Sequence, residues 1–381
     1  MPTMAKVNNK ILTWARERSG ISVPEFAAKN GISEERLRKW EDGTEALTFT
    51  QAQKFADKAH VPFGYLFLRE PPLDELPIPD LRTIDNRGVN RPSAELLDLL
   101  KLTLLRQQWY REYLSNEQGN PCELVGSVSQ NASAQVIVEN MRRKLGVQAH
   151  PIRGDWQDYY RDLVHRIESN GVLVMREASL GHHSRPLKVE EFRGFAIADK
   201  FAPIIFVNHA DAPGARLFTL MHELCHIWMG ISGISDGSDS PNRDSEVKCN
   251  AVAAEFLVPE AEFSPLWRDT EDWKDNLAPL QAHFHVSQWT LARRALTLGF
   301  IHTNQYRNYI AKQKELWDNR EKRTDGNGPS FHKTKNAQIS KLFSRAVLSQ
   351  AFNGQIMLRE AGQLLGINPA KLKNFANEVR F

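Results

Sequence analysis

The stretch His222-Glu223-Leu224-Cys225-His226 sets two histidines four positions apart, with a glutamate directly after the first. At 3.6 residues per turn, positions 222 and 226 lie one above the other on a helix, so both imidazoles can bind one metal ion. Glu223 is offset toward whatever else that metal binds, where a carboxylate can act as a base. The spacing therefore predicts a helix that carries a metal site.

The residues around this stretch also favour a helix. Asp211 can cap its start, Pro213 is tolerated in the first turn, and Gly230 ends it. An apolar stripe runs along it: Phe218, Met221, Cys225 and Trp228. The five-residue pattern alone is weak, since a chain of 381 residues with 12 histidines contains it by chance roughly a few times in a hundred. A third ligand is needed to decide.

Glu246 supplies that ligand, 20 residues after His226, where it opens a second apolar-periodic segment that continues to Val258. Two histidines and a glutamate leave a fourth coordination position open for water. Asn250 lies one turn beyond Glu246 on the same face, where it can hold a ligand histidine by its second ring nitrogen. The sequence therefore predicts metal ligands at His222, His226 and Glu246, with Glu223 as the catalytic base and Asn250 as a supporting residue.

Each of these residues also has a purely structural interpretation. A histidine on such a helix is more often a packed or surface residue, and a first-turn glutamate is often solvated and favoured by the helix dipole. The four residues taken together favour the metal site. Thiolates also bind zinc well, which is the alternative for Cys225 and Cys249. Cys225, however, points about 100° away from the histidine stripe of an ideal helix, and both cysteines are predicted to be small buried core residues.

The region around the site resembles the ImmA/IrrE metallopeptidase family over about residues 155 to 310. The likeness rests on Arg193 to Asp199, Ile204 to Asn208, Leu217 to Met221 before the histidine pair, Glu246 to Pro259, and Phe284 to Arg294. The resemblance implies a bacterial or phage intracellular zinc protease, in many members one that cleaves a helix-turn-helix repressor. It implies zinc ligands at His222, His226 and Glu246. Cys225 and Cys249 depart from the glycine or alanine that is common there.

The predicted fold class is α+β and mostly helical. A zincin-like metallopeptidase core with a small β-sheet is preceded by an all-α helix-turn-helix domain and followed by a small helical C-terminal unit. The expected boundaries are 1–70 for the helix-turn-helix domain, 71–92 for a Pro-rich linker, 93–310 for the metallopeptidase domain, 311–337 for a basic flexible linker and 338–381 for the C-terminal unit.

Hydrophobic periodicity places the main elements of the predicted core. Helices are expected at about 94–115, 131–144 and 156–168, and strands at about 172–175, 193–198 and 203–207. Residues 231–245 are rich in Gly, Ser and Asp and are predicted to form a loop that borders a substrate groove.

Residues 8–68 resemble an Xre-type helix-turn-helix, in which the helix that starts near Ser33 enters the major groove. Glu34 and Glu35 occupy the turn that ought to face phosphates and bases. Residues 1–70 hold 11 Lys and Arg against 9 Asp and Glu, a net charge of only +2. These charges favour a degenerate module that binds a protein partner over a sequence-specific reader of DNA, which stays a possibility.

Composition agrees with an intracellular enzyme. Three cysteines, an odd number, argue against a disulfide framework. The N-terminus has no signal-peptide core, and no run reaches the ~20 apolar residues of a membrane span. The sequence therefore predicts a cytoplasmic location and no membrane partner.

The predicted function is that of a zinc-dependent intracellular endopeptidase acting on a partner protein, which the resemblance implies to be a helix-turn-helix repressor or the product of an adjacent gene. Zn²⁺ is the expected cofactor, and Glu223 takes the proton of the attacking water. Candidate donors to the oxyanion are His283, His285, His302 and Tyr306. Two alternatives stay open: a DNA- or protein-binding regulator or antitoxin whose metal site is structural or inactive, and a metal-dependent hydrolase of non-peptide substrates.

Overall fold

The computed structural model of the chain describes residues 3–73, 92–148, 150–181, 184–235, 243–269, 271–318 and 338–379. It divides into two compact units, Met1–Leu102 and Thr103–Phe381, which are described separately below. Most of the two predicted linkers, 71–92 and 311–337, lies outside the described residues.

The first unit is all-α, and its helices begin at the polar caps that the sequence supplies. Its elements are α1 (Asn9–Arg18), α2 (Val23–Asn30), α3 (Glu34–Glu41), α4 (Phe49–Ala59) and the 3₁₀ helix η1 (Phe63–Phe67). The Ser33 side chain accepts a hydrogen bond at the start of α3, and Thr48 forms a reciprocal capping box with Gln51 at the start of α4. Phe26, Leu37 and Phe55 are fully buried between these helices.

The second unit is built on a four-stranded mixed sheet with the strand order β1-β3-β2-β4. The strands are β1 (Leu173–Glu177), β2 (Gly194–Ile197), β3 (Ile204–Asn208) and β4 (Gly233–Ser235). β1 pairs with β3 in parallel, and β2 pairs antiparallel with both β3 and β4. Three of the strands were predicted, but β4 is a correction, because it lies inside the segment predicted to be a loop.

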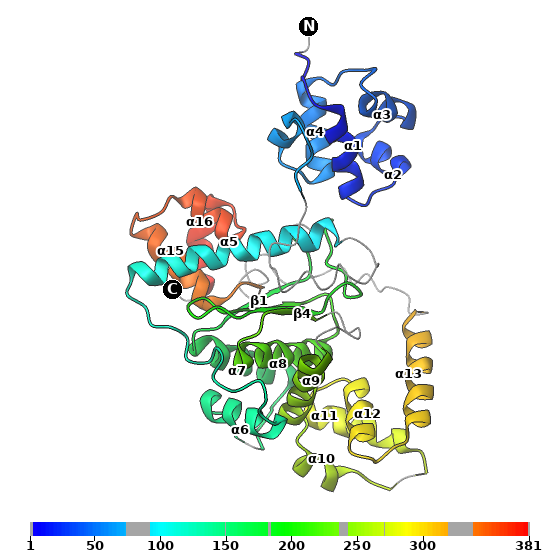
Figure 1. Ribbon diagram of the computed structural model, residues 1–381, viewed down its shortest axis with the longest axis vertical. Coiled ribbons are helices and arrows are strands. Elements are labelled where there is room, and N and C mark those ends of the chain that lie inside the picture. Colours follow the sequence, from blue (N-terminus) through cyan, green and yellow to red (C-terminus); the bar gives the residue numbers. More distant parts are fainter. Residues whose placement is uncertain are drawn as a thin grey trace. The chain divides into compact units, whose positions relative to one another are not determined.

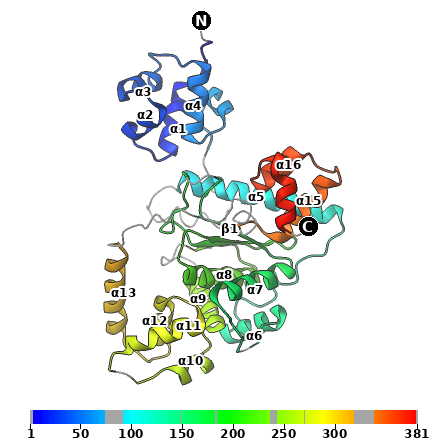
Figure 2. The ribbon, with the colours of Figure 1, turned by 180° about the vertical axis from the view of Figure 1, so that it is seen from behind.

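Helices cover both faces of this sheet, as Figures 1 and 2 show from opposite sides. On one side lie α6 (Ala134–Leu145), α7 (Trp156–Ser169), α8 (Pro213–Met229) and α9 (Arg243–Leu257). On the other lie the part of α5 (Ala94–Asn116) that belongs to this unit, from Thr103 on, and the helices α15 (Lys341–Phe352), α16 (Leu358–Leu365) and α17 (Leu372–Val379). The remaining elements include α10 (Glu260–Leu266), η3 (Trp273–Asn276), α11 (Leu277–Phe284), α12 (Gln288–Thr297), α13 (Thr303–Asp318) and η4 (Pro369–Lys371).

The two covered faces explain why every residue of β1, β2 and β3 is buried. Val174 and Ile205 are paired neighbours that share a core with α7 and α8. The alternate residues Phe195 and Phe206 are also paired, and their rings stack with centroids 5.0 Å apart. A strand buried on both faces needs no polar alternation. The α+β class and the mostly helical content are thus confirmed.

The predicted helices of the second unit are confirmed with small shifts at their ends. α6 begins at Ala134 because the Ser133 side chain accepts a hydrogen bond from the Val136 N–H, and it ends at Gly146 in the left-handed conformation. No helix within the described ranges is long and apolar enough to cross a membrane.

Candidate metal centre

Helix α8 carries the histidine pair, and residues at its two ends determine where it starts and stops. Pro213 occupies the first turn, and Gly230 ends the helix with φ 69°. The predicted cap by Asp211 is wrong in detail, since Ala212 is the N-cap residue. The Asp211 carboxylate instead accepts a hydrogen bond from the Ala212 N–H and pairs with Arg193 at 2.7 Å.

The structure brings together the three side chains predicted as metal ligands. The Nε2 atoms of His222 and His226 lie 3.2 Å apart. Glu246, in the first turn of α9, places its carboxylate oxygens 3.1 Å from Nε2 of His222 and 3.2 Å from Nε2 of His226. Three donor groups from two packed helices therefore converge on one point, while their role as ligands stays a prediction.

Burial and hydrogen bonding act in opposite directions on the pKa values of Glu246 and His222. Burial opposes ionisation of Glu246, but hydrogen bonds from His222 and His226 hold the pKa of its carboxyl well below the usual range. Burial likewise disfavours a charged His222, yet the hydrogen bond with Glu246 and the charge of Glu223 raise the pKa of that imidazole. Two imidazoles thus share one carboxylate in a site that attracts positive charge.

The donor set fits a divalent cation. At metal–nitrogen distances of about 2.0–2.1 Å, tetrahedral ligand nitrogens lie about 3.3 Å apart. The separation of 3.2 Å between the two Nε2 atoms matches this value. A cation here would replace the protons that the imidazoles and the carboxylate share, and nitrogen and oxygen donors of this kind favour zinc.

Asn250 lies where the sequence predicts a supporting residue. Its Oδ1 is 3.0 Å from Nδ1 of His222. An amide oxygen only accepts hydrogen bonds, so Nδ1 carries a proton, and Nε2 is the ring nitrogen that faces Glu246 and His226 and would bind a cation. The contact therefore fixes the tautomer and the ring orientation that metal binding requires.

Replacing Asn250 by alanine is expected to weaken zinc binding by about 10- to 100-fold, because His222 loses the acceptor that orients its ring. Competition with a chromogenic chelator measures this affinity. Asn250→Asp keeps an acceptor at the same place and serves as the control that retains tight binding. An unchanged affinity in Asn250→Ala contradicts the supporting role.

Glu223 is fully buried and lies against the start of β2. A Cβ atom at Gly194 would come within 2.9 Å of Oε1 of Glu223 and 2.8 Å of the Phe206 carbonyl oxygen. Only glycine therefore allows the strand to approach the carboxylate this closely. This packing fixes the side chain of Glu223, the residue that follows His222 in the sequence. Its catalytic role stays a prediction.

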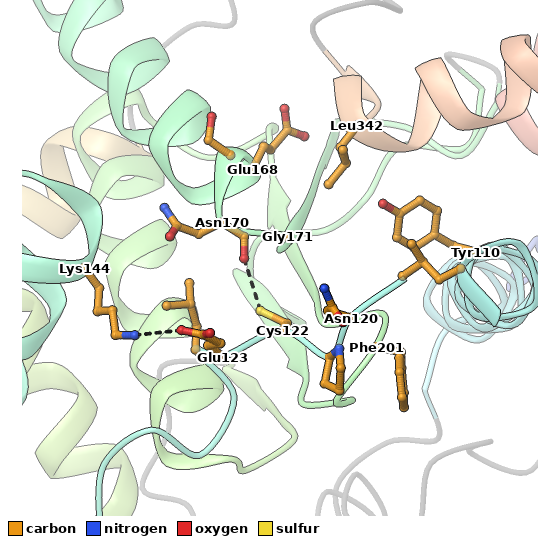
Figure 3. Close-up of a pocket in the computed structure, with 14 residues that line it drawn as sticks. Tyr110, Asn120, Cys122, Glu123, Lys144, Glu168, Asn170, Gly171, Phe201 and Leu342 are labelled. Atoms are coloured by element: carbon orange, nitrogen blue, oxygen red, sulfur yellow. Dashed lines mark hydrogen bonds and ion pairs between the residues drawn. The ribbon is translucent and has the colours of Figure 1, made fainter. Parts of the chain in front are cut away.

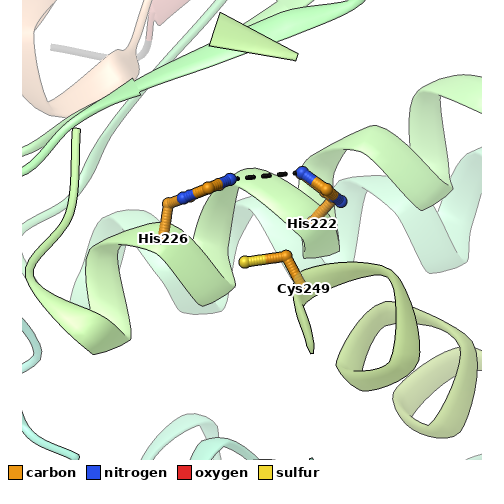
Figure 4. Close-up of side chains that lie close together, drawn as sticks. All are labelled: His222, His226 and Cys249. Carbon is orange, nitrogen blue, oxygen red and sulfur yellow. Dashed lines mark hydrogen bonds between the residues drawn. The ribbon is translucent and has the colours of Figure 1, made fainter. Parts of the chain in front are cut away.

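Cys249 is the member of this site that sequence reasoning missed. Its predicted burial is correct, since both Cys225 and Cys249 are fully buried. Its sulfur, however, lies with the ring nitrogens of His222 and His226, all within 4.8 Å of one another (Figure 4). The sequence did contain a sign of this position, because Cys249 lies three residues after Glu246, on the same face of α9.

The residues proposed as oxyanion donors are engaged elsewhere. Nε2 of His283 lies 2.6 Å from a Glu262 oxygen, and Nε2 of His285 lies 2.7 Å from the Gly154 carbonyl oxygen. Tyr306 lies beneath the Arg293 guanidinium. Over the described part of the chain, no recorded contact joins these residues or His302 to the metal-centre side chains. The structure therefore gives no support to any of them as the donor.

A cavity of about 410 Å³ lies apart from this centre, and none of the predicted site residues lines it (Figure 3). Its wall includes Tyr110 and Phe201, and a hydrogen bond of 3.2 Å joins the Cys122 thiol to the Asn170 carbonyl oxygen. Burial raises the pKa of the Cys122 thiol, which disfavours a nucleophilic role.

Comparison with known families agrees with this geometry. Residues 168–296, which contain the sheet and the histidine helix, match the Peptidase_M78 family model, described as an IrrE N-terminal-like domain. Residues 339–378 match a domain of unknown function, DUF8813. No curated protein matches the chain significantly. The first match supports the resemblance to the ImmA/IrrE family and a metallopeptidase type of function for this part of the chain.

Proposed function

We propose that the chain is a zinc-dependent endopeptidase that hydrolyses a peptide bond in a partner protein inside the cell. The single observation that carries this proposal is the convergence of His222, His226 and Glu246 within 3.2 Å of one another. The buried carboxylate of Glu223 beside them supplies the base that hydrolysis needs.

The roles of the side chains follow from their positions. His222, His226 and Glu246 would hold zinc, which when bound supplies a Lewis acid that lowers the pKa of water and polarises a carbonyl. Glu223 accepts the proton of the attacking water and then donates it to the leaving amine. Asn250 keeps His222 in the binding tautomer.

The first unit supports a protein partner more than a DNA partner. Each cation of α3 lies beside a carboxylate: Arg36 beside Glu45, Arg38 beside Glu34, and Lys39 beside Glu35. Exposed pairs of this kind add little stability, but the carboxylates repel the phosphates that the cations would bind. We therefore propose a protein partner rather than DNA, and the resemblance to the ImmA/IrrE family implies a helix-turn-helix repressor encoded nearby as the substrate.

Cleavage by the full-length chain tests this function. Incubation with the co-expressed product of the adjacent gene is expected to give two fragments whose masses define one cleaved bond. Removal of the metal by a chelator should abolish the reaction, and zinc should restore it. Cleavage that continues undiminished in chelator contradicts the proposal, as does a partner that stays intact with both the zinc-loaded wild type and Cys249→Ala, which lacks the thiol beside the two histidines.

A regulator with a structural metal site is the second candidate, and Cys249 is the observation that favours it. Thiolate, two imidazoles and a carboxylate would complete a four-ligand site of the closed, structural kind. The two candidates differ in Glu223, because a structural site has no use for a buried base.

A further inference from the structure

Cys249 lies in the metal centre rather than only in the core beside it. It follows Glu246 by one turn of α9, and its side chain points toward α8 beside the two imidazole rings (Figure 4). Its sulfur and one nitrogen from each histidine all lie within 4.8 Å of one another. The side chain is fully buried, so water does not compete for this position.

These separations suit a thiolate bound to the same cation as the histidines. With metal–sulfur distances of about 2.3 Å and metal–nitrogen distances of about 2.0–2.1 Å, tetrahedral sulfur and nitrogen ligands lie about 3.6 Å apart. The separations of at most 4.8 Å allow this contact with a small adjustment of the side chain. Thiolate is also a preferred ligand of zinc, and the cation itself removes the thiol proton.

Cys225 provides a comparison, because it is a buried cysteine of the same region that lies outside the group of converging donor atoms. It is as buried as Cys249 and directly precedes His226. It does not belong to the group of side chains whose donor atoms converge. Its thiol is hydrogen-bonded to that of Cys249 instead, so the two cysteines pack together while only Cys249 lies among the converging donor atoms.

We propose that Cys249 is a fourth protein ligand of the centre and keeps it latent by taking the position that two imidazoles and a carboxylate leave open. The inference rests on the proposed function. A four-coordinate cation with four protein ligands has no place for water or a substrate carbonyl, so hydrolysis begins only after the thiolate leaves. Loss of the thiol therefore converts a closed centre into an open one.

The full-length protein loaded with cobalt(II) in place of zinc tests this proposal by absorption. The wild type is expected to show the near-ultraviolet charge-transfer band that a cobalt–thiolate bond gives. Cys249→Ala should lose that band and keep the visible bands of bound cobalt, because His222, His226 and Glu246 remain. Cys225→Ala removes an equally buried thiol one helix away and should keep the band. Identical spectra for wild type and Cys249→Ala overturn the proposal.

A measurement on the wild type alone covers the case in which Cys249→Ala does not fold. X-ray absorption of the zinc-loaded protein should detect one sulfur at about 2.3 Å. Its absence overturns the ligand role without any variant. Latency is tested separately, since the cleavage rate of Cys249→Ala should exceed that of the wild type, and an equal rate contradicts it.

The two proposals fail in different ways. A wild type that cleaves its partner but lacks both the cobalt band and the zinc-bound sulfur excludes the role of Cys249 and leaves the peptidase intact. A wild type with both signals, whose partner stays whole even in Cys249→Ala, excludes the peptidase and supports the structural site.

Discussion

Glu223→Gln is expected to lower the rate of partner cleavage by about 10²- to 10⁴-fold while the protein keeps its zinc. Glutamine has the shape of glutamate but cannot accept a proton, so water loses its base and the leaving amine loses its acid. The side chain is fully buried and packs closely on Gly194, where an added Cβ atom would lie 2.9 Å from Oε1 of Glu223. The amount of each fragment formed over time, followed by mass spectrometry, measures the cleavage rate. Elemental analysis measures the zinc content of the protein.

A matched control separates the chemistry from a general effect of removing charge. Glu139→Gln makes the same substitution on the exposed face of α6 and should cleave at the wild-type rate. Both variants should have melting temperatures close to that of the wild type if the fold is kept. A Glu223→Gln protein that is folded, zinc-loaded and still active would show that another residue is the base.

The histidine helix was predictable because its information is local. The spacing of His222 and His226 puts them on one face of any helix, and Gly230 marks the end of that helix. Glu246 and Asn250 were predictable for the same reason. Glu246 opens a second periodic segment, and Asn250 lies one turn further along it. The packing of α8 on α9 then brings these faces together.

The features that the sequence did not predict depend on contacts distant in the chain. β4 exists because Ile234 pairs with Phe195 of β2, which no pattern within 231–245 indicates. Asp211 does not cap α8 because Arg193 holds its carboxylate. Cys249 reads as a core residue until the helix on which it lies is placed against the histidines. The local sequence pattern therefore predicted which residues form the candidate metal site, whereas the packing of the helices decides whether Cys249 lies with them.

The C-terminal helices are tied to the peptidase sheet by a buried arginine. Arg106 of α5 is 1% exposed, donates to the Leu364 carbonyl oxygen of α16 at 2.9 Å, and pairs with Glu177 at the end of β1 at 3.2 Å. A buried charge needs both partners, because water cannot replace either. Arg106 is therefore one of the contacts that join the region of unknown function to the sheet.

Arg106→Ala is expected to destabilise the second unit by about 3–5 kcal/mol, since it breaks a buried ion pair by removing one of its two members. Arg111→Ala is the matched control on the same helix: its guanidinium is 54% exposed and pairs with Asp199 at 3.0 Å. That exposed pair should contribute only about 0–1 kcal/mol. Urea unfolding of the full chain measures both losses, and hydrogen exchange of α16 reports whether its docking loosens.

The double variant Arg106→Met with Glu177→Met shows which part of the loss comes from removing only one member of the buried pair. Replacing both members of a buried pair by apolar side chains is often close to neutral, so most of the stability should return. Hydrogen exchange in α16 should stay faster than in the wild type, because methionine cannot donate to the Leu364 carbonyl oxygen. Equal destabilisation by Arg106→Ala and Arg111→Ala would mean that this arginine does not hold the C-terminal helices on the sheet.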